Sequence, residues 1–209
     1  MITILDYGMG NCGSIKNMLR YLGADAAIVS EPEELENAKA IILPGVGSYD
    51  YGVKQLDPFK SVLEKKVLRE KVPFLGICLG MQLLLESSEE GQLSGLGWIK
   101  GEAKRFDFTS IEGDQRLVVP HMGWNEVKPV TPSDIMQSVE KHSHDRFYFV
   151  HSYHADRVPE ENQISVCHYG YDFTCAVQHK NIYGTQFHPE KSHKFGKQLF
   201  SRFIRLTEC

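Results

Sequence analysis

The sequence predicts an α/β fold with a mixed, mainly parallel sheet, helices on both faces and antiparallel additions. In the first 90 residues, short apolar runs alternate four times with segments of helical periodicity, a pattern typical of parallel βαβ units. From about residue 97 the pattern changes to short strands separated by turn residues. The 209 residues contain no linker, low-complexity segment or internal repeat, so residues 1–209 are expected to form a single domain.

Apolar, β-branched runs predict four strands in the first half, at residues 2–5, 26–29, 40–45 and 72–77. A helix is expected over 14–23, because apolar residues recur there at helical spacing and Gly23 can close the last turn. A short helix is expected over 33–38, since Pro32 is a residue type favoured in a first turn. Two more helices complete the alternation, one beginning after residue 78 and one built on Val62, Leu63, Val67 and Leu68.

The second half of the chain is expected to add antiparallel strands to this core. The strand-like runs lie at residues 97–106, 116–124, 146–155, 164–170 and 174–188. The last element is expected to be a helix with an apolar stripe along one face. The stripe consists of Phe195, Leu199, Phe203 and Ile204.

Composition excludes several classes of function. A net charge of −4 gives no sign of a nucleic-acid partner, and without a run of 18 apolar residues no membrane span is expected. The N-terminus, MITILDYGMGN, lacks the basic region and cleavage site of a signal peptide. The five cysteines are an odd number and form no disulfide or CxxC pattern, so free thiols in the cytoplasm are expected.

The segment Gly76-Ile77-Cys78-Leu79-Gly80 has the form of a nucleophile elbow, a sharp turn from a strand into a helix. Its glycines leave room for a tight, strained turn that presents the sulfur at the carboxyl end of the sheet. The start of the helix favours the thiolate and leaves the Leu79 N–H free for an oxyanion. A buried structural cysteine with close-packing glycines is the alternative.

A thiol nucleophile needs a base, and the base needs a group that orients it. His188 and Glu190 are two residues apart at the end of a strand-like run, so their side chains can point the same way. Pro189 between them suits a strand end, because it cannot donate a ladder hydrogen bond. A surface histidine and glutamate on a loop are the alternative.

Four segments carry a resemblance to a known family: LPGVGSY, GICLGMQ, VPHMGWN and QFHPEKS. The chain resembles the class I glutamine amidotransferases, and within them the glutaminase subunits of imidazole glycerol phosphate synthases. The resemblance extends from DYGMGN near the N-terminus to FHPEKS near the C-terminus. It implies a flavodoxin-like, three-layer fold, hydrolysis of L-glutamine to glutamate and ammonia, and neither a metal nor a cofactor.

The resemblance implies a role for each matching residue. Cys78 would attack the carboxamide carbon of glutamine and form a thioester. His188 would protonate the departing ammonia and then activate water, while Glu190 would orient His188. The backbone N–H groups of Leu79 and Val46 would bind the oxyanion. The other residues of the substrate pocket would be Gly47, Gln82, Ser152 and Tyr153.

Glutaminases of this family supply ammonia to a synthase, and the resemblance implies a (β/α)8 cyclase as heterodimer partner in histidine biosynthesis. The partner interface would include Met122, Trp124, Asn125 and Lys191. Large apolar residues beside small polar ones suit a docking surface. The alternatives are a core strand for Met122 and Trp124 and a solvated side chain for Lys191. A glycine beside Val46 makes a peptide flip easy, so low glutaminase activity without the partner is expected.

Some residues depart from the histidine-pathway pattern, among them Cys12 and the tyrosines of PGVGSYDYG. Together with EKSHKFG and GLGWIKGEAKRF, they resemble a paralogous branch that supplies ammonia to a sugar amidotransferase of surface-polysaccharide synthesis. The catalytic residues would be the same in both branches, and only the acceptor enzyme would differ.

Functions of other classes are the remaining alternatives. GMGNCG at 8–13, with Glu31 placed as a ribose-binding acid, matches the fingerprint of a dinucleotide-binding module. A non-catalytic regulatory module and a cysteine hydrolase of another class, such as a peptidase, are two more. Four histidines have spacings that suit zinc, but no cysteine or carboxylate set completes a site, so surface histidines are expected. They are His142, His144, His151 and His154, and the resemblance places the last two in the segment on the substrate side.

Overall fold

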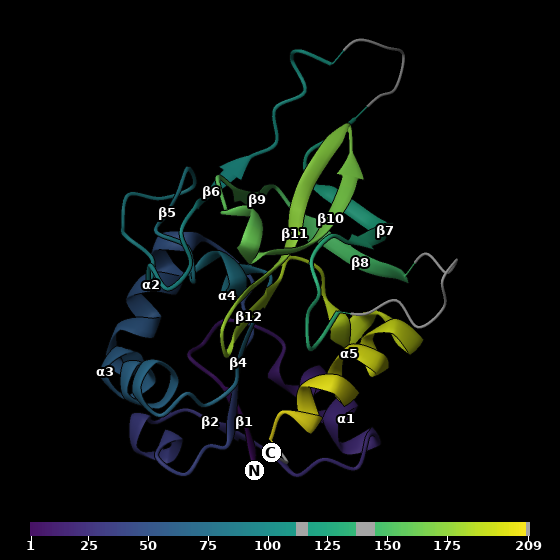
Figure 1. Cartoon of the computed structure of the whole chain (residues 1–209). Coiled ribbons are helices and arrows are strands. Elements are labelled where there is room, and N and C mark those ends of the chain that lie inside the picture. The colour runs from purple at the N-terminus through teal and green to yellow at the C-terminus, as the bar shows by residue number, and fades with distance from the viewer. Residues whose placement is uncertain (112–116, 137–144, 208–209) are drawn as a thin grey trace.

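The computed structural model describes residues 1–111, 117–136 and 145–207. One sheet runs through the molecule (Figure 1). Its parallel part has the order β2 (Ala26–Val29), β1 (Ile2–Leu5), β3 (Ala40–Leu43), β4 (Phe74–Ile77) and β12 (Ile182–Thr185). It continues antiparallel through β11 (Tyr171–His179), β10 (Gln163–Tyr169), β7 (His121–Pro129) and β8 (Asp145–His151). A branch of β5 (Ser87–Ser88), β6 (Glu102–Arg105) and β9 (Tyr153–Asp156) joins β11 through β9. The predicted mixed sheet with antiparallel additions is confirmed.

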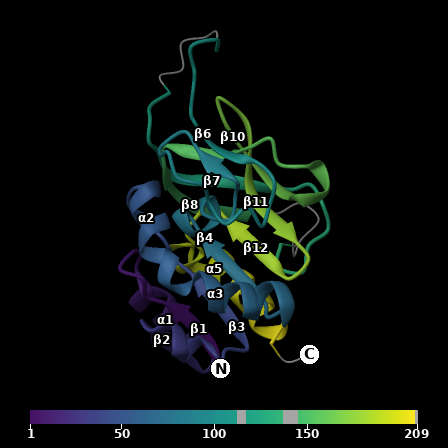
Figure 2. The same ribbon diagram turned by 90° about the vertical axis from the view of Figure 1, so that its left-hand side faces the viewer.

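Helices cover both faces of the parallel part, which gives three layers, seen side by side in Figure 1 and from one helical face in Figure 2. One face carries α1 (Cys12–Tyr21) and α5 (His193–Arg205), and the other carries α2 (Tyr49–Leu56), α3 (Lys60–Leu63) and α4 (Leu79–Gln82). Strand residues alternate between the layers, so that Ile4 packs with α1 and α5 while Leu5 packs with the opposite helices. The remaining helical segments are η1 (Pro32–Leu35), η2 (Asp57–Phe59), η3 (Glu64–Arg69), η4 (Glu160–Asn162) and η5 (Pro189–Lys191).

The helix after Cys78 is shorter than its apolar run predicted. It ends at Gln82, because the carbonyl groups of residues 83–85 accept hydrogen bonds from amides of residues 96–99 instead of continuing the helix. The helix expected over 33–38 is likewise only the 3-10 turn η1. Local propensity is overridden in the first case by a tertiary backbone contact, which no periodicity can reveal.

The third predicted helix changes form along its length. After α2, η2 and α3 it becomes the π-helical segment η3, whose wider turns shift the phase of the side chains. Lys66 is therefore buried, with its ammonium group bonded to the Glu36 carbonyl oxygen at 2.8 Å, whereas Leu68 is exposed. The prediction of Leu68 on the buried face is wrong for this reason.

The terminal helix α5 matches its prediction, since Leu199 and Phe203 on its apolar stripe are fully buried. Four cysteines of the described ranges, Cys12, Cys78, Cys167 and Cys175, are free thiols, while Cys209 lies outside those ranges. No helix in the described part of the chain is both long enough and apolar enough to span a membrane.

The strand-like run at 174–188 divides into β11 and β12, and the two strands differ in direction. β12 is a parallel neighbour of β4, with Thr185 paired to Ile77, rather than one of the antiparallel additions expected in the second half. The other runs shift in extent: the first shortens to β6, and the next begins at His121 and extends to Pro129. The placement of β12 decides where the functional site forms.

Candidate active site

Cys78 lies at the turn from β4 into α4 with φ 55° and ψ −110°, a conformation that is strained for a residue with a side chain. The two flanking glycines make this turn possible. A Cβ on Gly80 would lie 2.0 Å from the carbonyl oxygen of Leu43, and one on Gly76 would lie 2.5 Å from the carbonyl oxygen of Gly80. The predicted elbow geometry is therefore present at the carboxyl end of the sheet.

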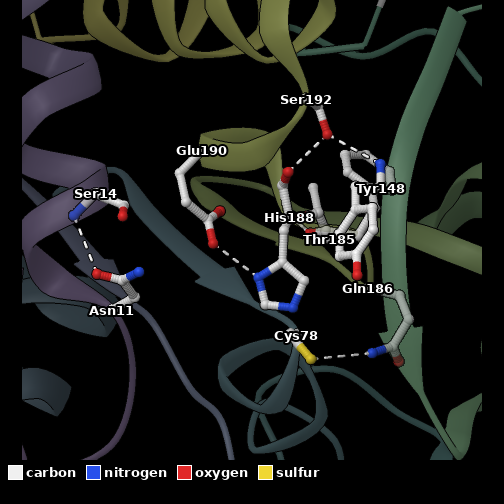
Figure 3. A network of polar contacts seen from close by, with 10 residues as sticks. Asn11, Ser14, Cys78, Tyr148, Thr185, Gln186, His188, Glu190 and Ser192 are labelled. Atoms are coloured by element: carbon white, nitrogen blue, oxygen red, sulfur yellow. Dashed lines mark hydrogen bonds and ion pairs between the residues drawn. The ribbon is translucent and has the colours of Figure 1, made fainter. Parts of the chain in front are cut away.

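The parallel pairing of β12 with β4 brings His188 to this elbow. The backbone N–H of Cys78 donates to the carbonyl oxygen of Thr185 at 2.7 Å, and that of His188 donates to the carbonyl oxygen of Tyr148 at 2.9 Å. The chain after β12 is thus held between β4 and β8. Figure 3 shows the His188 imidazole turned toward the sulfur.

His188 and Glu190 form a buried pair: His188 Nδ1 lies 2.8 Å from Glu190 Oε1, and each side chain is only 3% exposed. Ser192 fixes the turn, since its Oγ donates to the His188 carbonyl oxygen at 2.6 Å and accepts from the Tyr148 N–H at 3.0 Å. With Nδ1 donating to the carboxylate, Nε2 faces Cys78 (Figure 3) and has no hydrogen-bond partner among the described residues. The alternative of an exposed loop pair is wrong.

The electrostatics of the pair favour an imidazolium. Burial on its own would lower the pKa of His188, but hydrogen bonding and charge attraction to Cys78 and Glu190 outweigh it and raise that pKa to about 10. A protonated imidazole next to the sulfur stabilises a thiolate. The site therefore places a proton donor beside the sulfur, as nucleophilic attack and subsequent proton donation require.

Replacing Glu190 with glutamine is expected to narrow the pH range of activity. Loss of the carboxylate charge lowers the pKa of His188, so the alkaline limb of the kcat/KM profile for glutamine hydrolysis should move to lower pH. The rate at about pH 8 should fall about 10- to 100-fold, the effect of losing a hydrogen bond to a charged group. The exposed His168–Asp172 pair, 2.7 Å apart, supplies the matched control Asp172→Asn, which should leave the profile unchanged. An alkaline limb that stays in place would contradict the role of Glu190.

A cavity of about 410 Å³ opens at the sulfur. Of the residues predicted for the site, it is lined by Val46, Gly47, Cys78, Leu79, Gln82, Ser152, Tyr153 and His188. Residues from four separated stretches of sequence thus meet around one hollow. Glu190 is not at its surface, since it lies behind the imidazole. The alternative of a purely structural cysteine is disfavoured, because such a residue would not open onto a cavity.

Of the other four lining residues, Glu90, Pro120 and Val150 were not predicted for the pocket, whereas His151 lies in the segment that the resemblance places on the substrate side. Glu90 is the one acidic side chain among the lining residues. Burial raises its pKa, while the backbone N–H of Tyr49, which donates to its carboxylate at 3.1 Å, opposes that shift. The sequence held no signal for Glu90, because the loop after α4 is folded back by contacts with distant residues, among them the hydrogen bonds that the Gln92 and Leu93 N–H groups donate to Asp50.

The LPGVG loop forms another wall of the cavity. Tyr7 Oη donates to the Pro44 carbonyl oxygen at 2.8 Å, and burial raises the pKa of this phenol, so it stays a donor. Gly45 packs directly on α4, where a Cβ would lie 2.7 Å from the Gly80 nitrogen. The loop is therefore anchored before Val46, which is 47% exposed, and Gly47 follows with φ 106°. The first amide of α4, at Leu79, has no partner within its own helix, and Leu79 lines the same hollow.

The described histidines of HSYH are buried, contrary to the surface position expected for them. His151 and His154 are 5% and 4% exposed, and their rings lie 5.1 Å and 4.7 Å from the Phe106 ring between centroids. Burial lowers the pKa of both, so both are neutral. His151 Nδ1 donates to the Tyr153 carbonyl oxygen at 2.8 Å, which makes this histidine part of the pocket wall.

The residues predicted for docking lie on the outer side of β7 and near η5. Met122 and Trp124 are 62% and 40% exposed, so the alternative of a core strand is wrong for both. Trp124 stacks on His193 at 5.4 Å between ring centroids, and Lys191 lies 5.7 Å from the centre of the Tyr148 ring.

Asn125 connects this surface to the pocket through a hydrogen-bond chain. Its Nδ2 lies 3.3 Å from His121 Nε2, and His121 Nδ1 lies 3.0 Å from His151 Nε2. Burial lowers the pKa of His121 to about 4, so both imidazoles are neutral and each donates from Nδ1. The chain ends at the Tyr153 carbonyl oxygen, which His151 Nδ1 contacts.

The glycine-rich segment GMGNCG packs beside the active site. The side chain of Asn11 accepts from the Ser14 N–H at 3.2 Å and caps α1, which contacts η5 beside Glu190 (Figure 3). A Cβ on Gly10 would lie 2.8 Å from Pro44 Cβ, so the loop packs tightly against LPGVG. Within the described ranges no cluster of three metal-ligating side chains occurs, while His142 and His144 lie outside those ranges.

Gln186 is a buried polar residue near the sulfur that the sequence did not predict. Its Nε2 lies 3.6 Å from Cys78 Sγ. It stands two residues before His188, and only the pairing of β12 with β4 brings it to the elbow. The signal available in the sequence was a polar residue within an apolar strand-like run.

The chain matches known proteins over nearly its whole length. Residues 3–206 match the family described as "Glutamine amidotransferase class-I". Imidazole glycerol phosphate synthase subunit HisH 2 of Methanococcus maripaludis is 48% identical over 207 residues, covering 98% of this chain and 99% of the relative. The subunit HisH of Leptospira borgpetersenii is 45% identical over 99% of this chain and 100% of the relative. HisH 2 of Pseudomonas aeruginosa is 45% identical with the same coverage.

Solved structures agree on the fold. The structure titled PurLQS from Thermotoga maritima has a TM-score of 0.76 at 20% identity, with 98% of this chain and 97% of that chain covered. A structure titled as a glutamine amidotransferase has a TM-score of 0.74 at 19% identity, with 100% of this chain and 99% of that chain covered. At these identities the likeness concerns fold alone. Together with the full-length match to the HisH sequences, the findings establish that the chain belongs to the class I glutamine amidotransferases and, within them, to the HisH subunits of imidazole glycerol phosphate synthase.

Proposed function

We propose that the chain hydrolyses L-glutamine with a Cys78–His188–Glu190 triad and passes the ammonia to a partner synthase. One observation carries the proposal: a strained elbow cysteine and a buried His–Glu pair meet in a cavity. The cavity also presents a carboxylate, an amide side chain and free backbone amides, groups suited to the polar ends of an amino acid. We place the reaction in the cytoplasm, in keeping with its free thiols.

The geometry supports a mechanism of two steps, the formation of a thioester and its hydrolysis. The Cys78 thiolate attacks the carboxamide carbon, and the negative charge that forms on its oxygen is stabilised by the N–H groups of Leu79 and Val46. The imidazolium of His188 gives its Nε2 proton to the departing nitrogen, so that ammonia leaves and a thioester remains. Neutral His188 then takes a proton from water, which attacks the thioester and releases glutamate and the thiolate.

Pocket residues hold the substrate in this mechanism. Gln82, Ser152, Tyr153 and Gly47 contact its polar groups, and the Glu90 carboxylate pairs with its α-ammonium group. Burial destabilises the charged form of this carboxylate, and a bound cation compensates for that cost. The pocket should therefore bind a substrate with an α-ammonium group, such as an amino acid, better than a simple amide.

The partner that fits best is the (β/α)8 cyclase of imidazole glycerol phosphate synthase, because the full-length relatives are subunits of that enzyme by name. It would dock on Met122, Trp124, Asn125 and Lys191. The hydrogen-bond chain from Asn125 to the Tyr153 carbonyl offers a route by which docking changes the pocket. With a flexible peptide at Val46, this predicts low glutaminase activity in the free subunit.

A glutaminase of the paralogous branch, with another acceptor enzyme, is the second candidate. Two HisH sequences from one organism allow a comparison. Methanococcus maripaludis has two HisH sequences, and this chain is 48% identical to HisH 2 but 39% identical to HisH 1. Both relatives are named as subunits of imidazole glycerol phosphate synthase, so the case for a sugar amidotransferase of surface-polysaccharide synthesis as acceptor depends on the segments EKSHKFG and GLGWIKGEAKRF of this sequence. The triad and pocket would be unchanged.

Glutamate release from L-glutamine by the purified chain tests the proposal. It should be measured alone, with the histidine-pathway cyclase of the same source, and with a candidate sugar amidotransferase. We expect low release alone and a rise of at least about tenfold with one partner, the scale of a typical coupling between sites. Stimulation by the cyclase supports the histidine pathway, and stimulation by the amidotransferase supports the second candidate. Full activity without any partner would contradict the role proposed for docking.

A further inference from the structure

Gln186 is a fully buried amide that stands beside the nucleophile. Parallel register pairs Thr185 with Ile77, so the next residue on each strand, Gln186 and Cys78, leave the sheet side by side. The Gln186 backbone is held by its N–H, which donates to the Cys175 carbonyl oxygen at 2.8 Å. Its side chain is 0% exposed, so each of its polar atoms needs a partner inside the protein.

Both ends of the Gln186 amide have a partner. Its Nε2 lies 3.6 Å from Cys78 Sγ, and its Oε1 accepts from Gln82 Nε2 at 3.1 Å. Gln82 Nε2 also donates to the Tyr153 carbonyl oxygen at 3.2 Å. A chain of amides therefore runs from the pocket wall to the sulfur (Figure 3 shows its Gln186 end).

The direction of this chain is fixed by the backbone carbonyl at its far end. The Tyr153 carbonyl can only accept, so Gln82 must turn its NH₂ group toward it. The second hydrogen of that group then points at Gln186, which must present its oxygen. This leaves the Gln186 NH₂ group facing Cys78, because the opposite orientation would place two donors 3.1 Å apart.

We propose that Gln186 is a catalytic residue of the glutaminase reaction, and that its amide N–H donates a hydrogen bond to the Cys78 thiolate. This inference rests on the proposed function and extends it by one residue. A hydrogen bond to an ionised acceptor is stronger than one to a neutral acceptor, so the donor favours the thiolate over the thiol. Because the Gln186 NH₂ group cannot accept the thiol proton, His188 Nε2 is the basic group beside the sulfur that can take it.

The same chain determines what Gln82 offers to the substrate. Both hydrogens of its amide are engaged, one by Tyr153 and one by Gln186. The Gln82 side chain therefore presents its oxygen to a ligand, and it can accept an N–H but cannot donate one. Gln186 thus acts on the sulfur directly and on the pocket through Gln82.

Two substitutions separate these effects. Gln186→Met keeps the size of the side chain but removes both the donor and the acceptor. Gln186→Glu keeps the acceptor for Gln82 and, ionised, removes the donor to the sulfur. The matched control is Gln178→Met, on the neighbouring strand β11, where the amide donates to Asp134 at 3.2 Å and not to the sulfur.

The first readout is the rate at which iodoacetamide alkylates Cys78 in the full chain from about pH 7 to about pH 10, followed by peptide mass spectrometry. We expect Gln186→Met to slow alkylation about tenfold, and Gln186→Glu to slow it further at the higher pH where its buried carboxyl ionises, while Gln178→Met stays within about twofold. The second readout is glutamine hydrolysis with the partner. There kcat should fall about tenfold in both Gln186 variants, but KM should rise only in Gln186→Met, which leaves Gln82 without its acceptor.

The outcomes separate failure of this inference from failure of the proposed function. Unchanged alkylation in both folded Gln186 variants would overturn the inference, even if activity falls. If Gln186→Met does not fold, Gln186→Glu decides the matter: alkylation rates equal to wild type from about pH 7 to about pH 10 overturn the inference, because the rate must fall where the carboxyl ionises. A wild-type chain that releases no glutamate with any partner would reject the proposed function, while the alkylation rates would still report whether Gln186 acts on the sulfur.

Discussion

Replacing Cys78 with alanine is expected to lower glutamine hydrolysis by at least about 10⁴-fold, because removing the nucleophile of a triad eliminates the covalent route. The side chain is small and lines the cavity, so its loss should leave the fold intact. The measurement is glutamate release in the presence of the stimulating partner, with the fold of the variant checked by circular dichroism. Binding of the partner should not change, since the elbow lies inside the cavity and not on the surface of β7.

The cysteines that lie away from the cavity provide the control. Cys12 is also a buried free thiol, but its Sγ contacts the Leu5 carbonyl oxygen at 3.8 Å, and burial raises its pKa to about 11. Cys12→Ala should therefore leave the glutaminase rate within about twofold. Activity that survives in Cys78→Ala, or disappears in Cys12→Ala, would assign the nucleophile to another residue.

Replacing Gly80 with alanine is expected to destabilise the protein by at least about 4 kcal/mol, a loss in the range that marks a severe core clash. The added Cβ would lie 2.0 Å from the carbonyl oxygen of Leu43, in a central strand that cannot move aside. Urea unfolding followed by circular dichroism measures the effect. Any folded fraction should also lose glutaminase activity, since relief of the clash moves α4 and the elbow.

Gly13→Ala is the matched control, since Gly13 lies in α1 with only one atom near the added Cβ, Asn11 Oδ1 at 3.9 Å. Alanine fits there and favours a helix, so this variant should be more stable by about 0.5–1 kcal/mol. If Gly80→Ala unfolds at the same urea concentration as the wild type, the close approach of α4 to β3 is not what holds the elbow.

Local patterns in the sequence are enough to identify the reacting groups. Cys78 between glycines and His188 two residues before Glu190 can be recognised without any knowledge of the fold, because an elbow and a strand-end pair are built by neighbouring residues. The alternation of strands and helices in the first half was also predictable, since buried parallel strands and amphipathic helices each have a characteristic pattern of apolar residues in the sequence.

The neighbours of the nucleophile, in contrast, depend on strand pairing across the whole chain. β12 pairs parallel with β4 although it follows a run of antiparallel strands. The sequence of a short apolar strand does not indicate whether its neighbour runs parallel or antiparallel to it. That one pairing brings His188 and Gln186 to Cys78. The burial of His151 and the arrival of Glu90 likewise depend on backbone contacts between distant segments, which no local pattern encodes.

The short helix α4 illustrates the same limit at the scale of a single turn. Its apolar run predicts a longer helix, yet the carbonyls of residues 83–85 bond to the segment at 96–99. Helix propensity differs by fractions of a kcal/mol per residue, about the size of one such contact, so a tertiary hydrogen bond readily overrides it. Local sequence therefore specified the reacting groups, and long-range backbone pairing specified their geometry.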